Sequence, residues 1–178
     1  MTFAPDTAEA LEAAVFLSNS ELEPDSLTSL VDLTTFFDRF GYTGTRPSAR
    51  DLEAVRAIRT PLRALFQTTR DGAVPLVNDI LAVEGAVPQL TRHGDMDWHI
   101  HAAADDRPLA ARILVETAMA MVDVIRADEM QRFDHCAMDD CDGVVFDLSR
   151  NRSRKYCSVT CTNRAAQAAF RARQLEEA

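Results

Sequence analysis

Four cysteines near the C-terminus have a spacing that could bind a metal ion. They follow the pattern Cys136-x4-Cys141-x15-Cys157-x3-Cys161, and the first 135 residues contain no cysteine. Two close pairs separated by a hairpin-length insert suit a tetrahedral ion held by four thiolates, with each sulfur about 2.3 Å from Zn²⁺. We therefore predict one structural zinc ion per chain. A disulfide pair and buried free thiols are the alternatives.

The segments around these cysteines should bring both pairs to one ion. Residues 136–141 are predicted to form a tight turn closed by Gly143, and residues 144–149 and 154–157 the two strands of a hairpin. A helix is predicted from residue 158 to residue 175. Cys157 and Cys161 are four residues apart, so both can face the ion from the first helical turn. This combination predicts a treble-clef-like zinc finger with four cysteine ligands, which could also be purely structural.

The charge of the chain is divided between an acidic body and a basic C-terminal block. The net charge is −9, yet residues 148–175 contain seven basic and no acidic residues. Because an acidic chain repels nucleic acid through its overall charge, any DNA contact must come from this block. The basic residues are Arg150, Arg152, Arg154, Lys155, Arg164, Arg171 and Arg173.

The predicted C-terminal helix has two faces. Arg164, Gln167, Arg171 and Gln174 form a polar stripe suited to a DNA groove, because Arg contacts guanine or phosphate and Gln contacts adenine. An opposite stripe of small apolar residues is predicted to pack inward (Cys161, Ala165, Ala168, Ala172 and Leu175). The polar stripe also fits a solvated surface, and the arginines near the cysteines could instead offset the charge of the zinc–thiolate centre.

The C-terminal segment resembles the CGNR zinc-finger family, whose members are described as bacterial transcription regulators. The match covers about 40 residues, with Thr162 where the family has Gly and Ala166 where many members have Lys. The resemblance implies DNA contact through the basic block and through Asn163. The matching residues are Phe146, Asp147, Ser149, Arg150, Asn151, Ser153, Arg154, Tyr156, Cys157, Cys161, Asn163 and Arg164.

The first 130 residues resemble the ABATE domain, which usually precedes this finger and is described as stress-related. The resembling features are a helix ending near "FLSN" and the segments "DSLTSLVDLTTFFDRFG" and "DLEAVRAIRTPLRALFQ". We expect a mainly α fold with two parts: a helical domain over residues 1–132 with one small β-hairpin, and the zinc finger over residues 133–178. With no Gly-, Ser- or Pro-rich linker between them, the two parts are expected to pack together.

Hydrophobic spacing and capping residues predict where the other helices lie. Ser48 and Asp51 form a predicted capping box, and Pro61 is predicted to kink that helix. The segment "DGAVP" is predicted to be a turn. The predicted helices cover residues 6–18, 26–40, 48–70, 76–90 (broken near Gly85 and Pro88) and 106–132.

The segment "QLTRHGDMDWHIHAAA" alternates in polarity around Gly-Asp, which predicts a β-hairpin. Asp97, His99 and His101 would share one strand face opposite His93, and could bind a second metal or simply be half-exposed. His135 could support the zinc site, and Asn19 could cap the first helix or line a pocket.

These features predict a cytoplasmic transcription regulator without enzymatic activity. No phosphate loop, nucleophile elbow or catalytic carboxylate pair occurs. We also find no secretory signal or membrane-spanning run, so no membrane partner is expected. The helical domain would sense a small-molecule effector or form a homodimer, and the finger would bind DNA. In the alternative interpretation, the finger is a structural, protein-docking or redox-sensing module that does not contact DNA.

Overall fold

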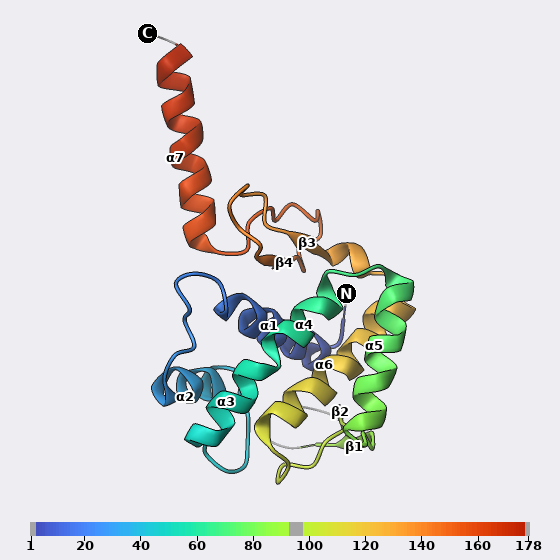
Figure 1. Cartoon of the computed structure of the whole chain (residues 1–178). Coiled ribbons are helices and arrows are strands. Elements are labelled where there is room, and N and C mark those ends of the chain that lie inside the picture. The colour runs from blue at the N-terminus through green and yellow to red at the C-terminus, as the bar shows by residue number, and fades with distance from the viewer. Residues whose placement is uncertain (1–2, 93–97, 177–178) are drawn as a thin grey trace.

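The computed structural model describes residues 3–92 and 98–176, and it is mainly helical, as predicted (Figure 1). Two short antiparallel hairpins, β1–β2 and β3–β4, complete it. The helices are α1 (Pro5–Ser20), α2 (Leu30–Arg39), α3 (Ala49–Ala57), α4 (Arg59–Phe66), α5 (Arg70–Val83), α6 (Leu109–Arg126), the 3-10 turn η1 (Met130–Arg132) and α7 (Val159–Glu176). The strands are β1 (Gln89–Thr91), β2 (His99–His101), β3 (Phe133–His135) and β4 (Val144–Phe146).

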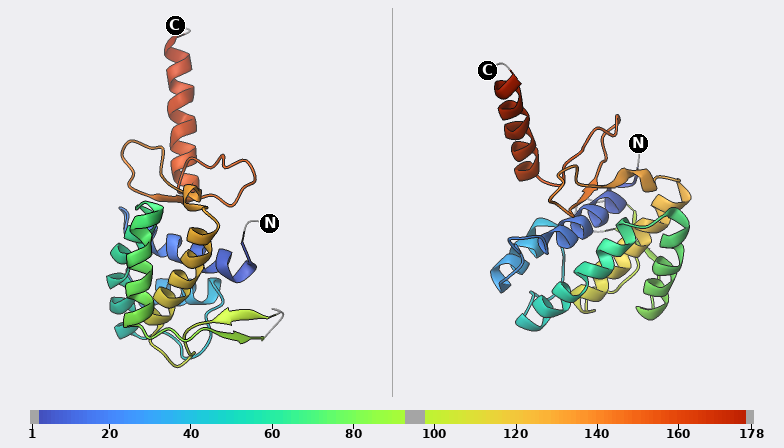
Figure 2. Two further views of the ribbon diagram at one scale, coloured as in Figure 1. Left: turned by 90° about the vertical axis from the view of Figure 1, so that its right-hand side faces the viewer. Right: turned by 45° about the horizontal axis from the view of Figure 1, so that its top comes forward.

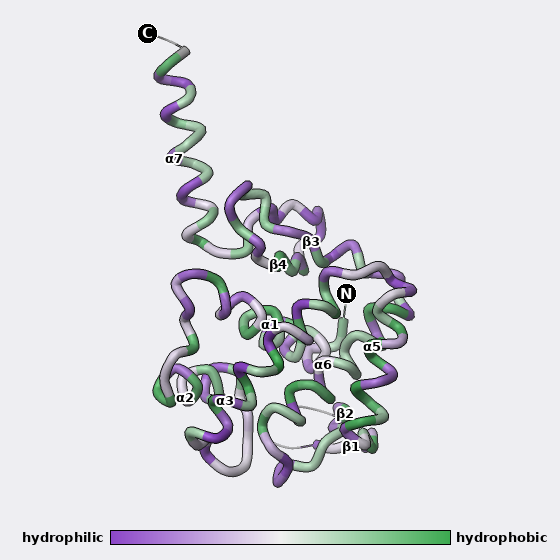
Figure 3. Tube along the Cα trace, viewed as in Figure 1, coloured by the Kyte–Doolittle hydropathy of each residue, from purple (hydrophilic) through white to green (hydrophobic). Residues whose placement is uncertain are grey.

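The hydrophobic core lies where α1 packs between α4 and α6, and α5 covers the other side of α6. Leu11, Leu17, Leu62, Ile113 and Met121 are fully buried there. Figure 3 shows hydrophobic stretches along α1 and α6, whereas hydrophilic stretches recur along α7. Among the described residues, no helix is both long and apolar enough to cross a membrane.

Capping residues set the starts of two helices. The predicted capping box of Ser48 and Asp51 is confirmed, and Ser29 and Asp32 form a second one. The second box starts α2 at Leu30, so the prediction of a helix from residue 26 was wrong. The predicted kink at Pro61 is a break at Ile58, because Pro61 cannot donate a hydrogen bond to the carbonyl of Ala57, four residues earlier.

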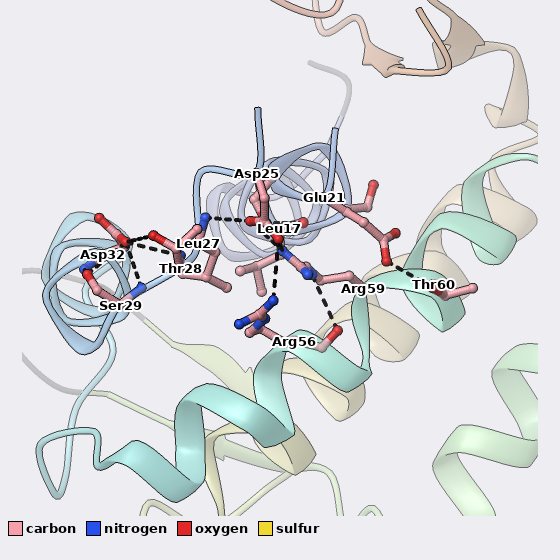
Figure 4. Close-up of polar contacts among 12 residues, drawn as sticks. Leu17, Glu21, Asp25, Leu27, Thr28, Ser29, Asp32, Arg56, Arg59 and Thr60 are labelled. Carbon is pink, nitrogen blue, oxygen red and sulfur yellow. Dashed lines mark hydrogen bonds and ion pairs between the residues drawn. The ribbon is translucent and has the colours of Figure 1, made fainter. Parts of the chain in front are cut away.

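A buried ion pair fastens the loop between α1 and α2 to α4 (Figure 4). Arg59 is 5% exposed, and its Nη1 lies 2.9 Å from Oδ1 and 3.1 Å from Oδ2 of Asp25. Asp25 also accepts a hydrogen bond from the backbone of Leu27. The hydrogen bond from Arg59 is the main reason why the pKa of Asp25 is lowered.

Two other predicted boundaries were wrong. The segment "DGAVP" lies inside α5, because the Thr69 side chain accepts a hydrogen bond from the backbone of Gly72 and starts the helix there. A Cβ at Gly72 would clash with Oγ1 of Thr68, so a larger residue here would require the Thr68 side chain to move. The helix ends at Val83, two residues before Gly85 with its φ of 58°, where a break was predicted. Helix α6 spans Leu109–Arg126, not 106–132, and residues 130–132 form η1.

The C-terminal part packs on the helical domain through α1 and α4. The rings of Phe66, Phe133 and Phe146 stack in a row, with centroids 4.8 Å apart at both steps. Strand β4 pairs with β3, so the predicted pairing of residues 144–149 with residues 154–157 was wrong. The returning segment instead accepts a hydrogen bond at Lys155 from the backbone of Ala137.

Helix α7 extends away from the rest of the molecule (Figures 1 and 2). In its described side chains, only Cys161 is buried and Ala165 half-buried. The prediction that Ala168, Ala172 and Leu175 pack inward was therefore wrong: Leu175 is 81% exposed. Five alanines between residues 165 and 172 explain how the helix forms without a packing partner, because alanine has the highest helix propensity.

Candidate metal centre

The four cysteines converge on one point, as the spacing predicted. Their sulfur atoms all lie within 4.8 Å of one another, and none is in a disulfide. The Sγ of Cys141 is 3.6 Å from that of Cys157 and 3.8 Å from that of Cys161, and the Sγ atoms of Cys157 and Cys161 are 3.8 Å apart. Among the described residues, this is the one group of ligands close enough to hold a metal ion.

The sulfur–sulfur distances test whether zinc fits this group. A tetrahedral ion with Zn–S bonds of about 2.3 Å places its ligands about 3.8 Å apart. Three of the sulfur–sulfur distances are between 3.6 and 3.8 Å, far longer than a disulfide bond of about 2.05 Å. The donor set is four thiolates, which zinc accepts in closed structural sites. The four cysteines therefore form a candidate metal site with the geometry of a four-thiolate zinc centre.

Short hydrogen bonds order each of the two cysteine-bearing segments. The amide of Cys136 donates to the carbonyl of Gly143 over 2.8 Å. Ser158 precedes α7, and its hydroxyl accepts a hydrogen bond from the amide of Cys161 over 3.1 Å. Cys157 lies before α7 begins and Cys161 in its first turn, so only one of the two ligands is helical.

Gly143 lies directly against the thiols. A Cβ at this position would approach Sγ of Cys157 to 2.5 Å and Sγ of Cys141 to 3.2 Å. Any side chain here would displace a ligand, which gives the predicted turn-closing glycine a more specific role. It keeps the space beside the sulfurs open.

The electrostatics of the thiols also favour a bound cation. Burial, followed by the neighbouring thiols, raises the pKa of Cys157 far above its usual range. Burial is likewise the main cause of the raised pKa of Cys141. At Cys136 burial also raises the pKa, but hydrogen bonds, first those from the backbone of Cys157 and Met138, lower the pKa by more. Four thiols at this distance can ionise together only if a divalent cation offsets their charge.

Family models match both parts of the chain. Residues 132–174 match the CGNR zinc finger, a range that contains all four cysteines. Residues 11–128 match the ABATE model, described as "Putative stress-induced transcription regulator", and cover about two thirds of the chain. The chain belongs to the ABATE family. It carries the CGNR finger directly after the ABATE domain, as the sequence predicted. No curated protein matches it.

Three of the predicted DNA-contacting residues are engaged within the protein. Arg154 donates to the carbonyls of Phe146, Tyr156 and Cys157 and thereby braces the finger. Nη2 of Arg152 lies 2.8 Å from Oε2 of Glu129. Arg164 pairs with Asp140 in the loop between the first two cysteines.

The other predicted contacts remain exposed. Arg150, Lys155, Arg171 and Arg173 form no ion pair within residues 3–92 and 98–176, and Asn163 and Gln167 are exposed on α7. Asp147 organises the loop that carries Arg150: it is buried and accepts hydrogen bonds of 2.7 Å from the backbone amides of Ser149 and Arg154.

Asn19 has a role that the sequence did not reveal. Its side-chain amide donates to the carbonyl of Val144 and accepts from the amide of Val144, each over 2.8 Å. It thus joins the end of α1 to β4 of the finger, and neither caps α1 nor lines a pocket. No local sequence signal could have found this contact, because the two residues are 125 positions apart.

The described residues include only part of the predicted histidine site. His99 is buried and His101 half-buried, with ring centroids 4.9 Å apart on one face of β2. His93 and Asp97 lie outside the described residues. His135 does not contact the thiols; its Nδ1 lies 3.4 Å from Nε2 of Gln67.

Proposed function

We propose that this protein is a zinc-dependent, DNA-binding transcription regulator, in which the finger presents α7 to duplex DNA and the ABATE domain controls that binding. The role is regulatory and involves no catalysis. The observation that carries the proposal is the exposure of α7, a basic helix anchored at one end by the cysteine site and covered by no other element of the described chain. An isolated helix of this kind is suited to enter a groove.

Charge and distance support DNA as the partner. The chain is acidic overall, so DNA must approach a part of it that lies away from the acidic domain. Helix α7 rises by about 1.5 Å per residue, which puts Arg171 roughly 18 Å from its start. That exceeds the screening length of about 10 Å at 0.1 M salt. Repulsion from the acidic domain is therefore weak at the far end of α7.

The polar face of α7 has the composition for base contacts. With about 100° between successive residues, Asn163, Arg164, Gln167, Arg171 and Gln174 fall within roughly 100° of the helix circumference. All five are exposed. Arginine reads guanine and glutamine or asparagine reads adenine in the major groove. We assign base contacts to this face.

Phosphate contacts are assigned to the exposed basic residues around it, Arg150, Lys155 and Arg173. Arg152 and Arg164 would have to leave Glu129 and Asp140 to join them. This exchange costs little, because exposed ion pairs contribute at most about 1 kcal/mol. Arg154 keeps its hydrogen bonds to the carbonyl groups of the finger.

The test measures binding of the zinc-loaded full chain to random-sequence duplex DNA by fluorescence anisotropy at several salt concentrations. Lys155→Ala and Arg173→Ala, at two residues assigned to phosphate, should each weaken binding and reduce the slope of log K against log salt by about one unit. Arg50→Ala, an exposed arginine at the start of α3, is the matched control and should leave both quantities unchanged.

Absence of DNA binding at low salt with one zinc per chain would defeat the proposal. It would favour the alternative that the basic face docks on an acidic protein.

Because one short helix reads few base pairs, we also propose that the protein binds as a homodimer on two half-sites. Sedimentation of the protein with and without DNA tests that part separately.

A further inference from the structure

A cavity in the ABATE domain has the chemistry of a ligand site. It measures about 160 Å³ and lies between α1, β2, α6 and the loop that follows α2. An engineered apolar cavity of roughly 150 Å³ holds one benzene molecule, so this space matches a ligand body about the size of one ring. Its apolar wall includes Ala10, Ala13, Phe40, Ile100 and Met119.

Glu116 is the most unusual group that lines this cavity. It lies on α6 among the buried residues Ile113, Val115, Thr117 and Ala120, and its own side chain is half-buried. No ion pair with Glu116 forms anywhere in the described part of the chain. Tyr42 lines the same cavity, and its hydroxyl interacts with the carboxylate of Glu116.

The surrounding charges are mostly negative. Asp6 and Glu9 of α1 and Asp123 of α6 line the same cavity as Glu116; the basic groups there are Arg112 and the imidazoles of His99 and His101. Both terminal nitrogens of Arg112 are already engaged: Nη1 donates to the carbonyl of Thr43 over 2.7 Å, and Nη2 lies 3.5 Å from the carboxylate of Asp105. The excess negative charge favours a cation in this cavity.

We infer that the cavity binds a small organic cation, with an ammonium group against Glu116 and an apolar body of about one ring between Phe40, Tyr42 and Met119. Aromatic faces beside the carboxylate add to the attraction for an ammonium group. Burial is the main cause that raises the pKa of Glu116 to about 7. A cation bound beside the carboxylate would stabilise its charged form and so offset the effect of burial.

The position of the cavity makes this cation a candidate effector. Helix α1 lines the cavity through Asp6 and Ala10 and carries Asn19 in its last turn, where that side chain holds β4 of the finger. A ligand that shifts α1 would therefore act on the element that holds the finger. The regulatory part of this inference rests on the proposed DNA-binding function, but binding of the cation does not.

Three probes that share a phenyl group and differ in charge test the inference. Their binding to the zinc-loaded full chain is measured by calorimetry. They are 2-phenylethylammonium, the neutral 2-phenylethanol and the anion 3-phenylpropionate. We expect the ammonium compound to bind at least about tenfold more tightly than the alcohol, because hydrogen bonds to a buried charge contribute about 1.5–3 kcal/mol. Equal binding of the three, or tighter binding of the anion, would overturn the inference.

Variants assign the effect to Glu116. Glu116→Gln should remove the preference for the ammonium compound over the alcohol. Glu12→Gln is the matched control, because Glu12 is exposed on α1 and does not line the cavity. Ala10→Phe should fill the cavity and weaken all three probes with Glu116 still present. A charge preference that survives Glu116→Gln would place the cation elsewhere and refute the assignment.

DNA binding is measured on the same variants. If the cation binds and DNA does not, the proposed regulatory function fails and the ligand site stands. If DNA binds and no probe prefers the positive charge, the ligand inference fails alone.

Discussion

The ABATE domain and the finger of this protein are stabilised by different physical means. The ABATE domain buries a continuous set of leucine, phenylalanine, isoleucine and methionine side chains between α1, α4, α5 and α6. In the finger, Phe133, Val144 and Phe146 pack on this core, and a small second cluster buries Cys136, Val145 and Cys161. Helix α7 has almost no buried surface beyond its first turn. Hydrophobic burial can therefore fold the first region, whereas the second depends on its four thiols.

Removing the metal is the strongest way to separate the two regions. Structural zinc contributes about 10–16 kcal/mol to small zinc-finger peptides at neutral pH. We expect Cys157→Ser, or chelation, to unfold the finger and most of α7 while the ABATE core stays folded. Circular dichroism should show the loss of one helix, and hydrogen exchange should place it at residues 159–176. Val159→Ala, at an exposed neighbouring position, should have no such effect. An α7 that stays helical without metal would contradict this view.

Neutralising Asp25 should destabilise the ABATE domain alone. Asp25→Asn leaves Arg59 buried without its carboxylate, at an expected cost of about 3 kcal/mol. The pKa of Asp25 is lowered in the folded state, mainly by Arg59. This contribution is therefore complete above the unfolded pKa of about 3.9 and is lost as the pH falls through the lower folded value.

The contribution of Asp25 can be measured through the pH dependence of unfolding. Urea unfolding should show the full difference between wild type and Asp25→Asn at pH 7 and a smaller one near pH 3. Asp38→Asn is the control, because Asp38 pairs with Arg46 on an exposed surface. A difference that stays constant with pH would exclude the ion pair as its source.

Removing the Asn19 side chain tests how the two regions are joined. Asn19→Ala leaves the amide and carbonyl of Val144, which is 1% exposed, without partners. We expect a loss of about 2 kcal/mol, because unsatisfied buried polar groups cost about 1–3 kcal/mol. Hydrogen exchange should rise in β3 and β4 more than in α6. Asn78→Ala, at an exposed site on α5, should change neither.

The difference between the regions also explains what the sequence could predict. The convergence of the four cysteines, both family resemblances and the capping box at Ser48 follow from local spacing, and the structure or the family models bear them out. Pairing of β4 with β3 and the bond from Asn19 to Val144 depend on distant contacts. The start of α5 was missed because Gly72 and Pro75 were given more weight than the capping threonine.

The inward packing predicted for α7 failed for a related reason. Alternating faces on a helix show which side could be buried, but not whether a partner exists. The alanines there support the helix through propensity, since they contribute little apolar surface. Glu116 was overlooked because no local pattern marks it: Tyr42, which interacts with it, is 74 positions away in the sequence.

The smallest predicted effect concerns the intrinsic stability of α7. Ala168 is exposed, so Ala168→Gly removes no packing and should cost about 1 kcal/mol of helix stability. Because residues 166–175 of α7 are exposed in the described chain, the loss should appear as faster amide exchange from residue 165 onward, with the melting temperature of the ABATE domain unchanged. Ala64→Gly, at an exposed position on α4 next to the buried Leu65, is the matched control. There the packed neighbours should keep exchange slow, and the cost should appear in global unfolding. Equal local exchange at both sites would show that α7 has a stabilising partner.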